Sequence, residues 1–305
     1  MSVVVVTGAG GFLGGALIEA LISQGHEVVG IDRHDARFIG QKTLNNSKFK
    51  FIKGEINAGG EDLLKEMTVD VIFHLAAKQP SAPGLSYEDF YKGNVESMLG
   101  ILALARKNKT RAVIYTSTIT VLSNQNKKMD EDAPCEPSNY YSLTKYIAEH
   151  MLRIESKNNG IKAVIVRFPS LMGKHHRGGL VNTYYGLAKT GADIEVFSKG
   201  KRLRNILYVS SAVEILIKVL SNLDRLESCE LFMAGSKDSL TTIDIARTIK
   251  DLLKSSSRIV PVDKSPAGDC DIVVDTAKAQ RSLGFAPISI AEGLKMYIAE
   301  KNNEV

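Results

Sequence analysis

The stretch that decides the fold is VVVVTGAGGFLG, residues 3–14. Four successive valines predict a buried strand, and the apolar residues of segment 13–22 recur at helical spacing. Between the two, Gly8, Gly11 and Gly14 stand in the spacing G-x-x-G-x-x-G. The stretch therefore predicts a strand, a tight turn and a helix, in that order.

Each of these glycines has a chemical role in a turn that binds a dinucleotide. Gly8 allows the sharp turn, Gly11 lets the backbone approach a pyrophosphate, and Gly14 lets the helix pack on the strand. The N-terminus of the helix then presents unpaired N–H groups to the phosphates. Such a pattern is weak evidence until an acidic residue is found at the end of the next strand.

That acidic residue is Asp32, which ends the predicted strand 27–32. A carboxylate at this place accepts hydrogen bonds from the ribose hydroxyls of an adenosine. Arg33 follows directly and would tolerate a 2′-phosphate, although Asp32 would repel one and an exposed arginine without a ligand is the alternative. We expect NAD as the cofactor, with NADP as the alternative.

Composition excludes several classes of protein. The chain has 305 residues, 44% apolar and 24% charged, which is typical of a globular protein with a large core. The net charge is +5, but the basic residues are scattered among acids, so nucleic acid is not an expected partner. Three distant cysteines without a C-x-x-C pair predict neither a disulfide framework nor a metal site. We interpret the apolar start as a strand rather than a signal peptide, find no membrane-spanning run, and expect a cytoplasmic protein.

Strand and helix patterns alternate through the first half of the chain, which predicts a parallel sheet. Ligands of such sheets lie outside the carboxyl ends of the strands, so the residues after each strand are candidate site residues. The further predicted strands are 49–53, 69–75, 112–117 and 161–167, and the further helices are 62–67, 87–107 and 140–157.

Two of these strand ends offer contacts for a cofactor. Glu55 would bond an adenine amino group and Ile56 would cover the ring, although a solvated loop carboxylate is equally consistent. The small side chains after the next strand would let the chain pass close to a ribose, in the run Leu75, Ala76 and Ala77.

Two polar residues are expected inside the fold. We interpret His74 as a packed, hydrogen-bonded core histidine. Asn94 stands on the apolar side of helix 87–107, and a buried amide needs partners. Asn94 is therefore expected to have a structural or relay role.

Hydroxyl groups gather at the end of strand 112–117, in the run Tyr115-Thr116-Ser117-Thr118. Downstream, Tyr141 and Lys145 are four residues apart and share a helix face. A neighbouring ammonium favours the phenolate and lowers the phenol pKa from its ordinary value of about 10. Tyr141 then serves as an acid or base, Thr118 holds the reacting oxygen, and Lys145 can bind ribose hydroxyls.

Two other pairs have the same Y-x-x-x-K spacing, Tyr185 with Lys189 and Tyr297 with Lys301. Only the pair of Tyr141 follows a strand end rich in hydroxyls and precedes a further core strand. We therefore interpret the other two as solvated helix faces, whose tyrosines fit equally well in a core.

Together these motifs resemble the extended short-chain dehydrogenase/reductases, in the NAD-dependent branch of epimerases and dehydratases that acts on nucleotide sugars. The resemblance runs the whole length of the chain, and stretches 200–209 and 275–284 match more loosely. The residues that carry it are 7–14, Asp32, 74–77, Asn94, 117–118, 141–145 and Arg167.

The resemblance implies an α/β fold, a doubly wound parallel Rossmann sheet of about seven strands with a smaller C-terminal α/β substrate lobe. It assigns residues 1–170 to an NAD-binding domain and 171–305 mainly to the substrate lobe, with roughly 200–225 returning to the first domain. It also implies a homodimer, in which helices 87–107 and 140–157 form a four-helix bundle.

The same resemblance implies a role for each site residue. Tyr141 is the acid/base, Thr118 its hydrogen-bonding partner and Lys145 the modulator of its pKa, while Arg204 binds a diphosphate or is an ordinary surface arginine. The implied substrate contacts are Thr118, Ser170, His176 and Arg204. The implied cofactor contacts are Gly8, Gly11, Phe12, Leu13, Gly14, Asp32, Arg33, Glu55, Ile56, Leu75, Ala76, Ala77, Asn94, Thr116, Tyr141, Lys145 and Phe168.

The chain also departs from the family pattern. Dehydratases carry an Asp-Glu pair after the threonine, where this chain has Ile119 and Thr120, so elimination of water is not expected. Ser170 and Asn205 replace the usual Asn and Asp of two substrate-binding motifs, and a late phosphate-binding arginine before Asp269 is missing.

Three functions follow from these residues. The first is an epimerase of a nucleoside-diphosphate sugar, in which Tyr141 takes a hydroxyl proton, hydride moves to NAD, and hydride returns to the other face. The second is a 4-keto reductase that uses exchangeable NADPH or NADH. The third is a nucleotide sensor without chemistry, against which the intact Thr118, Tyr141 and Lys145 argue. His175 and His176 are candidates for proton transfer at carbon, and solvation or substrate binding is the alternative.

Overall fold

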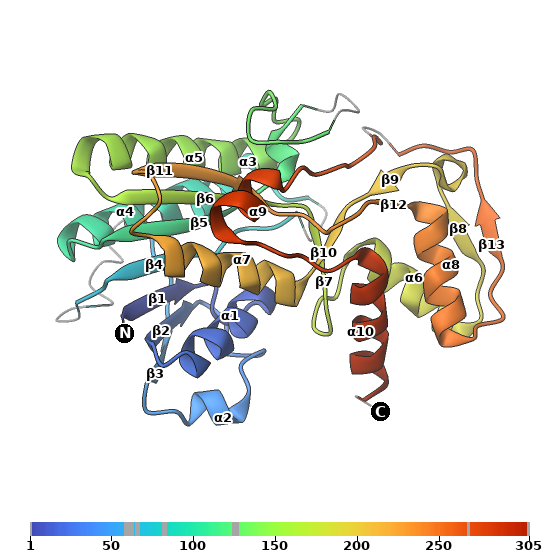
Figure 1. Ribbon diagram of the computed structural model, residues 1–305, viewed down its shortest axis with the longest axis horizontal. Coiled ribbons are helices and arrows are strands. Elements are labelled where there is room, and N and C mark those ends of the chain that lie inside the picture. The colour runs from blue at the N-terminus through green and yellow to red at the C-terminus, as the bar shows by residue number, and fades with distance from the viewer. Residues whose placement is uncertain are drawn as a thin grey trace. The chain divides into compact units, whose positions relative to one another are not determined.

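The computed structural model describes residues 2–57, 64, 68–80, 84–123, 128–266 and 269–303 (Figure 1). The chain forms two compact units. The first unit comprises 1–121, 135–167 and 213–232, and the second unit comprises 122–134, 168–212 and 233–305. Neither of these units is one continuous stretch of the sequence.

The first unit is built on a seven-stranded sheet, which confirms the predicted Rossmann-type sheet. The order of its strands is β11-β6-β5-β4-β1-β2-β3, and the pairs from β3 through β5 are parallel. Its strands are β1 Val3–Thr7, β2 Glu27–Asp32, β3 Phe49–Lys53, β4 Val71–His74, β5 Ala112–Thr118, β6 Lys162–Phe168 and β11 Cys229–Met233.

The direction of the strand order reverses between β1 and β4. The chain runs outward from β1 to β2 and β3 and then crosses to β4 on the other side. At this crossing Thr7 of β1 is the register partner of His74 of β4. The residues after both strands therefore leave the sheet side by side, at the place where doubly wound sheets bind their ligands.

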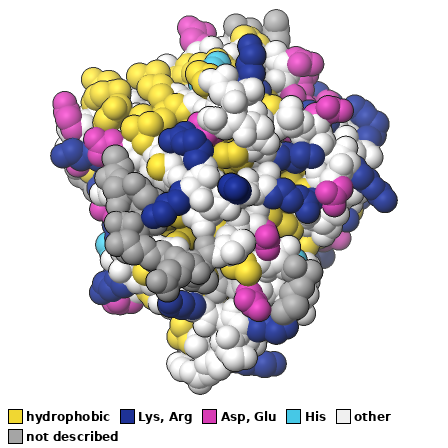
Figure 2. Space-filling model, turned by 90° about the vertical axis from the view of Figure 1, so that its left-hand side faces the viewer, with side chains coloured by type: hydrophobic (Ala, Val, Ile, Leu, Met, Phe, Trp, Pro, Cys, Tyr) yellow, Lys and Arg dark blue, Asp and Glu magenta, His cyan; other side chains and the backbone are white. Residues whose placement is uncertain are grey.

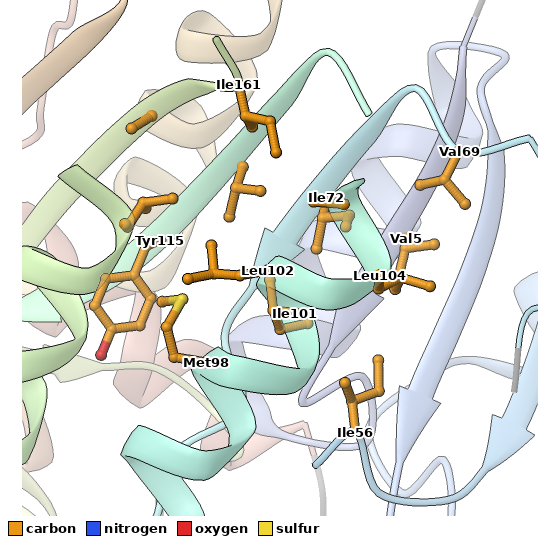
Figure 3. Close-up of a cluster of buried hydrophobic side chains, with 14 of the residues drawn as sticks. Val5, Ile56, Val69, Ile72, Met98, Ile101, Leu102, Leu104, Tyr115 and Ile161 are labelled. Atoms are coloured by element: carbon orange, nitrogen blue, oxygen red, sulfur yellow. The ribbon is translucent and has the colours of Figure 1, made fainter. Parts of the chain in front are cut away.

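Helices cover both faces of this sheet. Figure 1 shows α4 and α5 on one face and α1 and α7 on the other. Under α4 and α5, aliphatic side chains of the helices pack on those of the strands, including Met98, Ile101 and Ile72 (Figure 3). The helices are α1 Phe12–Ser23, α2 Gln41–Leu44, α3 Tyr87–Phe90, α4 Ser97–Lys107, α5 Tyr140–Asn159 and α7 Val209–Asn222, with a 3-10 turn at Ile119–Val121.

Local sequence signals explain the bounds of α5. Asn139 and Ser142 form a capping box at its start, and Gly160 ends it with a left-handed φ of 69°. The predicted helix 87–107 is confirmed as the succession of α3, a π-helical segment at Tyr91–Glu96, and α4. The predicted helix 62–67 lies outside the described residues, except for Leu64.

The second unit contains three two-stranded sheets, β10-β7, β12-β9 and β13-β8. Its helices α6, α8 and α10 pack around an apolar core in which Tyr185 and Tyr297 meet edge to face, 5.4 Å between ring centroids. The tyrosines of the two rejected Y-x-x-x-K pairs are thus core residues. The elements are β7 Ser170–Met172, α6 Gly179–Thr190, β8 Ile194–Val196, a 3-10 turn Ser198–Gly200, β9 Leu203–Arg204, β10 Ile206–Tyr208, β12 Leu240–Thr241, α8 Thr242–Leu253, β13 Ile259–Pro261, α9 Ala277–Leu283 and α10 Ile290–Asn302.

No helix among the described residues is long and apolar enough to cross a bilayer.

Candidate functional site

The turn after β1 packs so tightly against neighbouring backbone that Gly8 and Gly14 have no room for a side chain. Gly8 has a φ of +70°, and a Cβ there would lie 2.8 Å from the backbone nitrogen of Ala76. A Cβ on Gly14 would lie 2.1 Å from the carbonyl oxygen of Gly8. Helix α1 begins after Gly11 with no side-chain cap and no acidic residue in its first turn. The turn therefore leaves a helix N-terminus open to an anionic ligand.

Asp32 lies directly beside this turn. Its carboxylate accepts hydrogen bonds from the backbone N–H of Gly10 at 3.0 Å and of His34 at 2.8 Å. The next residue, Arg33, forms an exposed ion pair with Glu55, with 3.4 Å between Nη1 and Oε1. The candidate adenosine residues thus lie together at the ends of β2 and β3, and the Arg33 charge is partly offset by Glu55.

Ile56 has a different environment from Glu55. Its side chain is buried in the apolar core under α4, among the side chains drawn in Figure 3. The structure therefore places Ile56 within the core of the first unit.

The end of β4 is tied to the end of β1 by hydrogen bonds. His74 Nδ1 lies 2.8 Å from the Thr7 hydroxyl, and Nε2 lies 3.5 Å from the Ser97 hydroxyl. Burial lowers the pKa of His74 to about 3, with a smaller effect from the Lys145 charge, so the ring is neutral. The interpretation of His74 as a core histidine is confirmed. The Thr7 hydroxyl also accepts from the N–H of Ala76 at 3.3 Å, which holds segment 75–77 against the glycine turn.

Asn94 lies in the π-helical segment and is fully bonded. Its Oδ1 accepts from the N–H of Lys78 at 2.7 Å, and its Nδ2 donates to the Lys78 carbonyl at 3.3 Å and to the Thr144 hydroxyl at 2.9 Å. The amide therefore links the loop after β4 to helix α5, which agrees with the structural role expected for it.

Tyr141 and Thr118 meet at the carboxyl end of β5. The Tyr141 phenol interacts with the side chains of Gln79 and Thr118, and both interactions favour the phenolate. Thr118 Oγ1 lies 3.0 Å from the hydroxyl of Thr120 and accepts from its N–H at 3.2 Å. The structure thus joins the predicted acid/base to the predicted hydroxyl partner.

The Lys145 ammonium is buried under the same strand end. Its Nζ donates to the Thr116 carbonyl at 2.7 Å and lies 4.1 Å from the centroid of the Tyr115 ring. Burial lowers the pKa of Lys145 to about 7, and the charge of Glu149 opposes that shift. The ammonium is thus directed at the backbone of β5.

The pKa of the Tyr141 phenol departs from the direction predicted from the sequence. Burial raises it above the ordinary value, and the interactions with Gln79 and Thr118 only partly offset that effect. Lys145 is not among the groups that shift the pKa of Tyr141, and its ammonium contacts Thr116 and Tyr115 instead.

Of the predicted substrate residues, Thr118 lies in the first unit and Ser170, His176 and Arg204 lie in the second. Ser170 is exposed in β7, opposite Ile206 of β10, and His176 is half-buried in the loop that follows. Burial lowers the pKa of His176, and a backbone hydrogen bond at Gly178 opposes the shift. Phe168, at the end of β6, is buried.

Arg204 is held by acceptors of its own unit. Its Nη1 donates to the Cys270 carbonyl at 2.7 Å, and its Nη2 forms an ion pair with the Asp269 carboxylate. Asp269 also accepts from the Ser198 hydroxyl, and Arg202 Nε lies 3.5 Å away. Burial opposes ionisation of Asp269, but the hydrogen bonds from Ser198 and Arg204 hold its pKa below the ordinary value. Arg204 is therefore a paired arginine rather than a solvated one.

No group of three or more His, Cys, Asp or Glu side chains that would hold a metal ion occurs in the described part of the chain.

Residues 4–235 match the sequence model of the NAD dependent epimerase/dehydratase family. The chain belongs to this family. It is therefore an NAD-dependent enzyme, and its glycine turn, uncapped helix α1 and Asp32 fit the dinucleotide that the family uses.

Several relatives resemble the chain over nearly its whole length. An uncharacterised UDP-glucose epimerase of Bacillus subtilis (strain 168) is 27% identical over 314 residues, 97% of this chain and 96% of that protein. UDP-glucuronic acid decarboxylase 1 of Arabidopsis thaliana is 26% identical over 321 residues, 99% of this chain and 70% of that protein. The fold is shared with UDP-glucuronic acid 4-epimerase from Bacillus cereus, solved in complex with UDP-glucuronic acid and NAD. That structure has a TM-score of 0.87 and 24% identity, and the match covers 99% of this chain and 100% of that one.

The structure shows two further site residues that the sequence analysis missed, Gln79 and Glu149. Gln79 interacts with Tyr141 from a loop that carries no motif, so no sequence signal pointed to it. Glu149 is buried on α5 and holds Arg167 by two bonds, Nε–Oε1 at 2.9 Å and Nη2–Oε2 at 2.7 Å. Its position four residues after Lys145 was a usable signal, because the two side chains share a helix face.

Proposed function

We propose that this member of the NAD-dependent epimerase/dehydratase family is an epimerase of nucleoside-diphosphate sugars. The observation that carries the proposal is that Tyr141 interacts with Thr118 close to the buried Lys145, at the same edge of the sheet as the glycine turn. Relatives named as a UDP-glucose epimerase and a UDP-glucuronic acid decarboxylase support a uridine-diphosphate sugar as substrate.

The first unit would hold NAD with residues that lie together in the structure. The N-terminus of α1 at Gly11 would face the pyrophosphate, Asp32 would accept from the adenosine ribose, and Lys145 would donate to the other ribose. Bound NAD supplies the acceptor and donor of hydride. We assign NAD rather than NADP because Asp32 would repel a 2′-phosphate and Glu55 offsets the Arg33 charge.

Tyr141 would move the proton of the reacting hydroxyl. Its raised pKa keeps the phenol protonated at neutral pH, so Tyr141 must first lose its own proton to solvent, and a nearby positive charge would stabilise the phenolate that then acts as the base. Lys145 is the buried cation beside the strand that carries Thr118. Thr118 would hold the sugar oxygen while the Tyr141 phenolate takes its proton, and again while the resulting phenol returns the proton.

Two positions favour epimerisation over elimination of water. Ile119 is buried, and the hydroxyl of Thr120 is bonded to Thr118. Neither side chain is a carboxylic acid that would protonate a leaving hydroxyl. The reductase alternative gains no support from the relatives and the solved structure described above.

We infer that the second unit binds the nucleotide sugar, through Ser170, His176 and Arg204. The Arg204 fork is the side chain suited to a diphosphate. For Arg204 to bind one, the ligand would have to compete with Asp269 for the guanidinium.

We also propose that a second copy of the chain covers α4 and α5. Apolar side chains on these helices are exposed, Leu99 by 43%, Leu143 by 37% and Ile154 by 59%. Figure 2 shows hydrophobic side chains gathered on the upper part of one face of the molecule. Leu143 and Ile154 are eleven residues apart, about three helical turns, so they share one face of α5.

The cofactor content of the purified protein tests the proposal. The protein is purified without added dinucleotide and denatured, and the released small molecule is identified by absorbance and mass. An epimerase regenerates its cofactor in each cycle, so retained NAD is expected. An empty protein that binds NADPH reversibly and reduces a 4-keto sugar would overturn the epimerase proposal.

A further inference from the structure

Helix α5 carries two opposite charges inside the first unit. Lys145 is 2% exposed and Glu149 is 0% exposed, and the two are one helical turn apart. An isolated buried charge is strongly unfavourable unless it is paired or hydrogen bonded. Some group must therefore offset the Lys145 ammonium.

The neighbours of Lys145 show which group that is. From β4, His74 is neutral, and from β5 the ammonium meets the Thr116 carbonyl and the face of the Tyr115 ring. From the π-helical segment, the neutral amide of Asn94 reaches α5. On α5 itself Tyr141 is a protonated phenol, and Glu149 carries the negative charge that acts on Lys145.

The orientation of Glu149 is fixed from the next strand. Arg167 of β6 binds both of its carboxylate oxygens, and the ion pair is 2% and 0% exposed. Such a two-point contact holds the carboxylate in one position. Cys135 accepts a further bond from Arg167 Nη2, 3.2 Å to the sulfur.

We propose that Glu149, locked by Arg167, is a positioning residue that keeps the Lys145 side chain charged and directed at the carboxyl end of β5. The proposal rests on the role proposed above for Lys145. Glu149 acts only through Lys145.

The direction of the expected pH effect follows from the charges. Burial brings the pKa of Lys145 to about 7, and Glu149 works against that lowering. Removing the carboxylate charge therefore lowers the pKa further. Lys145 then loses its proton, and its bond to a ribose hydroxyl loses its charge, at a lower pH.

The test is the affinity for NAD between pH 5 and pH 9. It is measured by calorimetry on the full chain after any bound dinucleotide has been removed. In the Glu149→Gln variant we expect the pH midpoint at which affinity falls to move down by about one unit. Glu155→Gln is the matched control, because Glu155 is another buried carboxylate of α5, paired with Arg106 at 2.7 Å. Its midpoint is expected to match the wild type.

A second variant keeps the test valid if Glu149→Gln alone fails to fold. Glu149→Gln leaves the buried Arg167 charge unpaired, whereas Glu149→Gln with Arg167→Gln removes both charges. The double variant is expected to fold and to show a smaller downward shift, because loss of the Arg167 charge partly offsets loss of the Glu149 charge. A midpoint unchanged from the wild type in this folded variant overturns the proposal. Because the titration contains no sugar, failure to turn over nucleotide sugars would contradict the proposed function without affecting this result.

Discussion

At the scale of single residues, the proposed chemistry depends on the phenol of Tyr141. Tyr141 lies between Thr118 and Gln79, and burial keeps it protonated. Its hydroxyl is the only part of the side chain that would move a proton, so the ring can be kept while the chemistry is removed.

Tyr141→Phe is therefore expected to lower kcat for nucleotide-sugar epimerisation by about 100-fold or more, because a positioned acid/base contributes that much. The melting temperature should change little, since the ring remains packed. Steady-state assays and thermal melts measure the two quantities. The adjacent, exposed Tyr140→Phe is the control, and equal losses in both variants would count against the assigned role.

The glycine turn gives a second prediction at this scale. Gly14→Ala places a Cβ 2.1 Å from the Gly8 carbonyl oxygen, so the backbone must shift. We expect a loss of about 1–3 kcal/mol in the free energy of unfolding, with weaker binding of NAD. Gly186→Ala is the control, because a Cβ there has nothing within 4 Å and α6 would gain up to about 1 kcal/mol. Chemical denaturation measures both, and a neutral Gly14→Ala would show that the turn has room.

His74 predicts how stability depends on pH. Its pKa is about 3 in the folded chain against 6.5 ordinarily, so only the unfolded chain takes up a proton as the pH falls below 6.5. Stability is then lost progressively between pH 6.5 and about 3, by about 2 kcal/mol between pH 6.5 and pH 5. Urea denaturation at several pH values measures the free energy of unfolding. Between pH 6.5 and pH 5 it should fall by about 2 kcal/mol more in the wild type than in His74→Asn. Parallel slopes would mean that His74 has the same pKa in the folded and unfolded chains.

At the scale of elements, the sequence predicted the sheet and its main helices because their signals are local. The valine run before Gly8 and the capping box of Asn139 and Ser142 each act within a few residues. The π-helical segment around Asn94 was not predictable, because it depends on bonds to Lys78 and Thr144, which come from distant parts of the chain.

The difference between local signals and contacts of distant residues also applies to the candidate site. Thr118, Tyr141 and Lys145 were found from spacing and motif, and the structure brings the side chains of Thr118 and Tyr141 together. The direction of the Tyr141 pKa could not be predicted, since it depends on how deeply the ring is buried. Gln79 was missed because only the folded chain brings it to the phenol.

At the scale of the whole molecule, the exposed face of α4 and α5 predicts association. Ile154→Glu places a charge on the most exposed apolar side chain of that face, 59% exposed, and is expected to convert a dimer into monomers. Light scattering coupled to gel filtration measures the mass. Met296→Glu, on α10 of the second unit and 43% exposed, is the control. A wild-type monomer, or a dimer that survives Ile154→Glu, would contradict the proposed interface.

The central claim is that this enzyme inverts a sugar carbon by removing hydride and returning it to the opposite face. The measurement that tests it most directly is NMR of the purified protein with UDP-glucose or UDP-glucuronic acid in deuterated water, without added cofactor. An epimer is expected to form, and the inverted carbon is expected to keep its protium. Absence of any epimer from a protein that retains NAD, or deuterium at the inverted carbon, would contradict that claim.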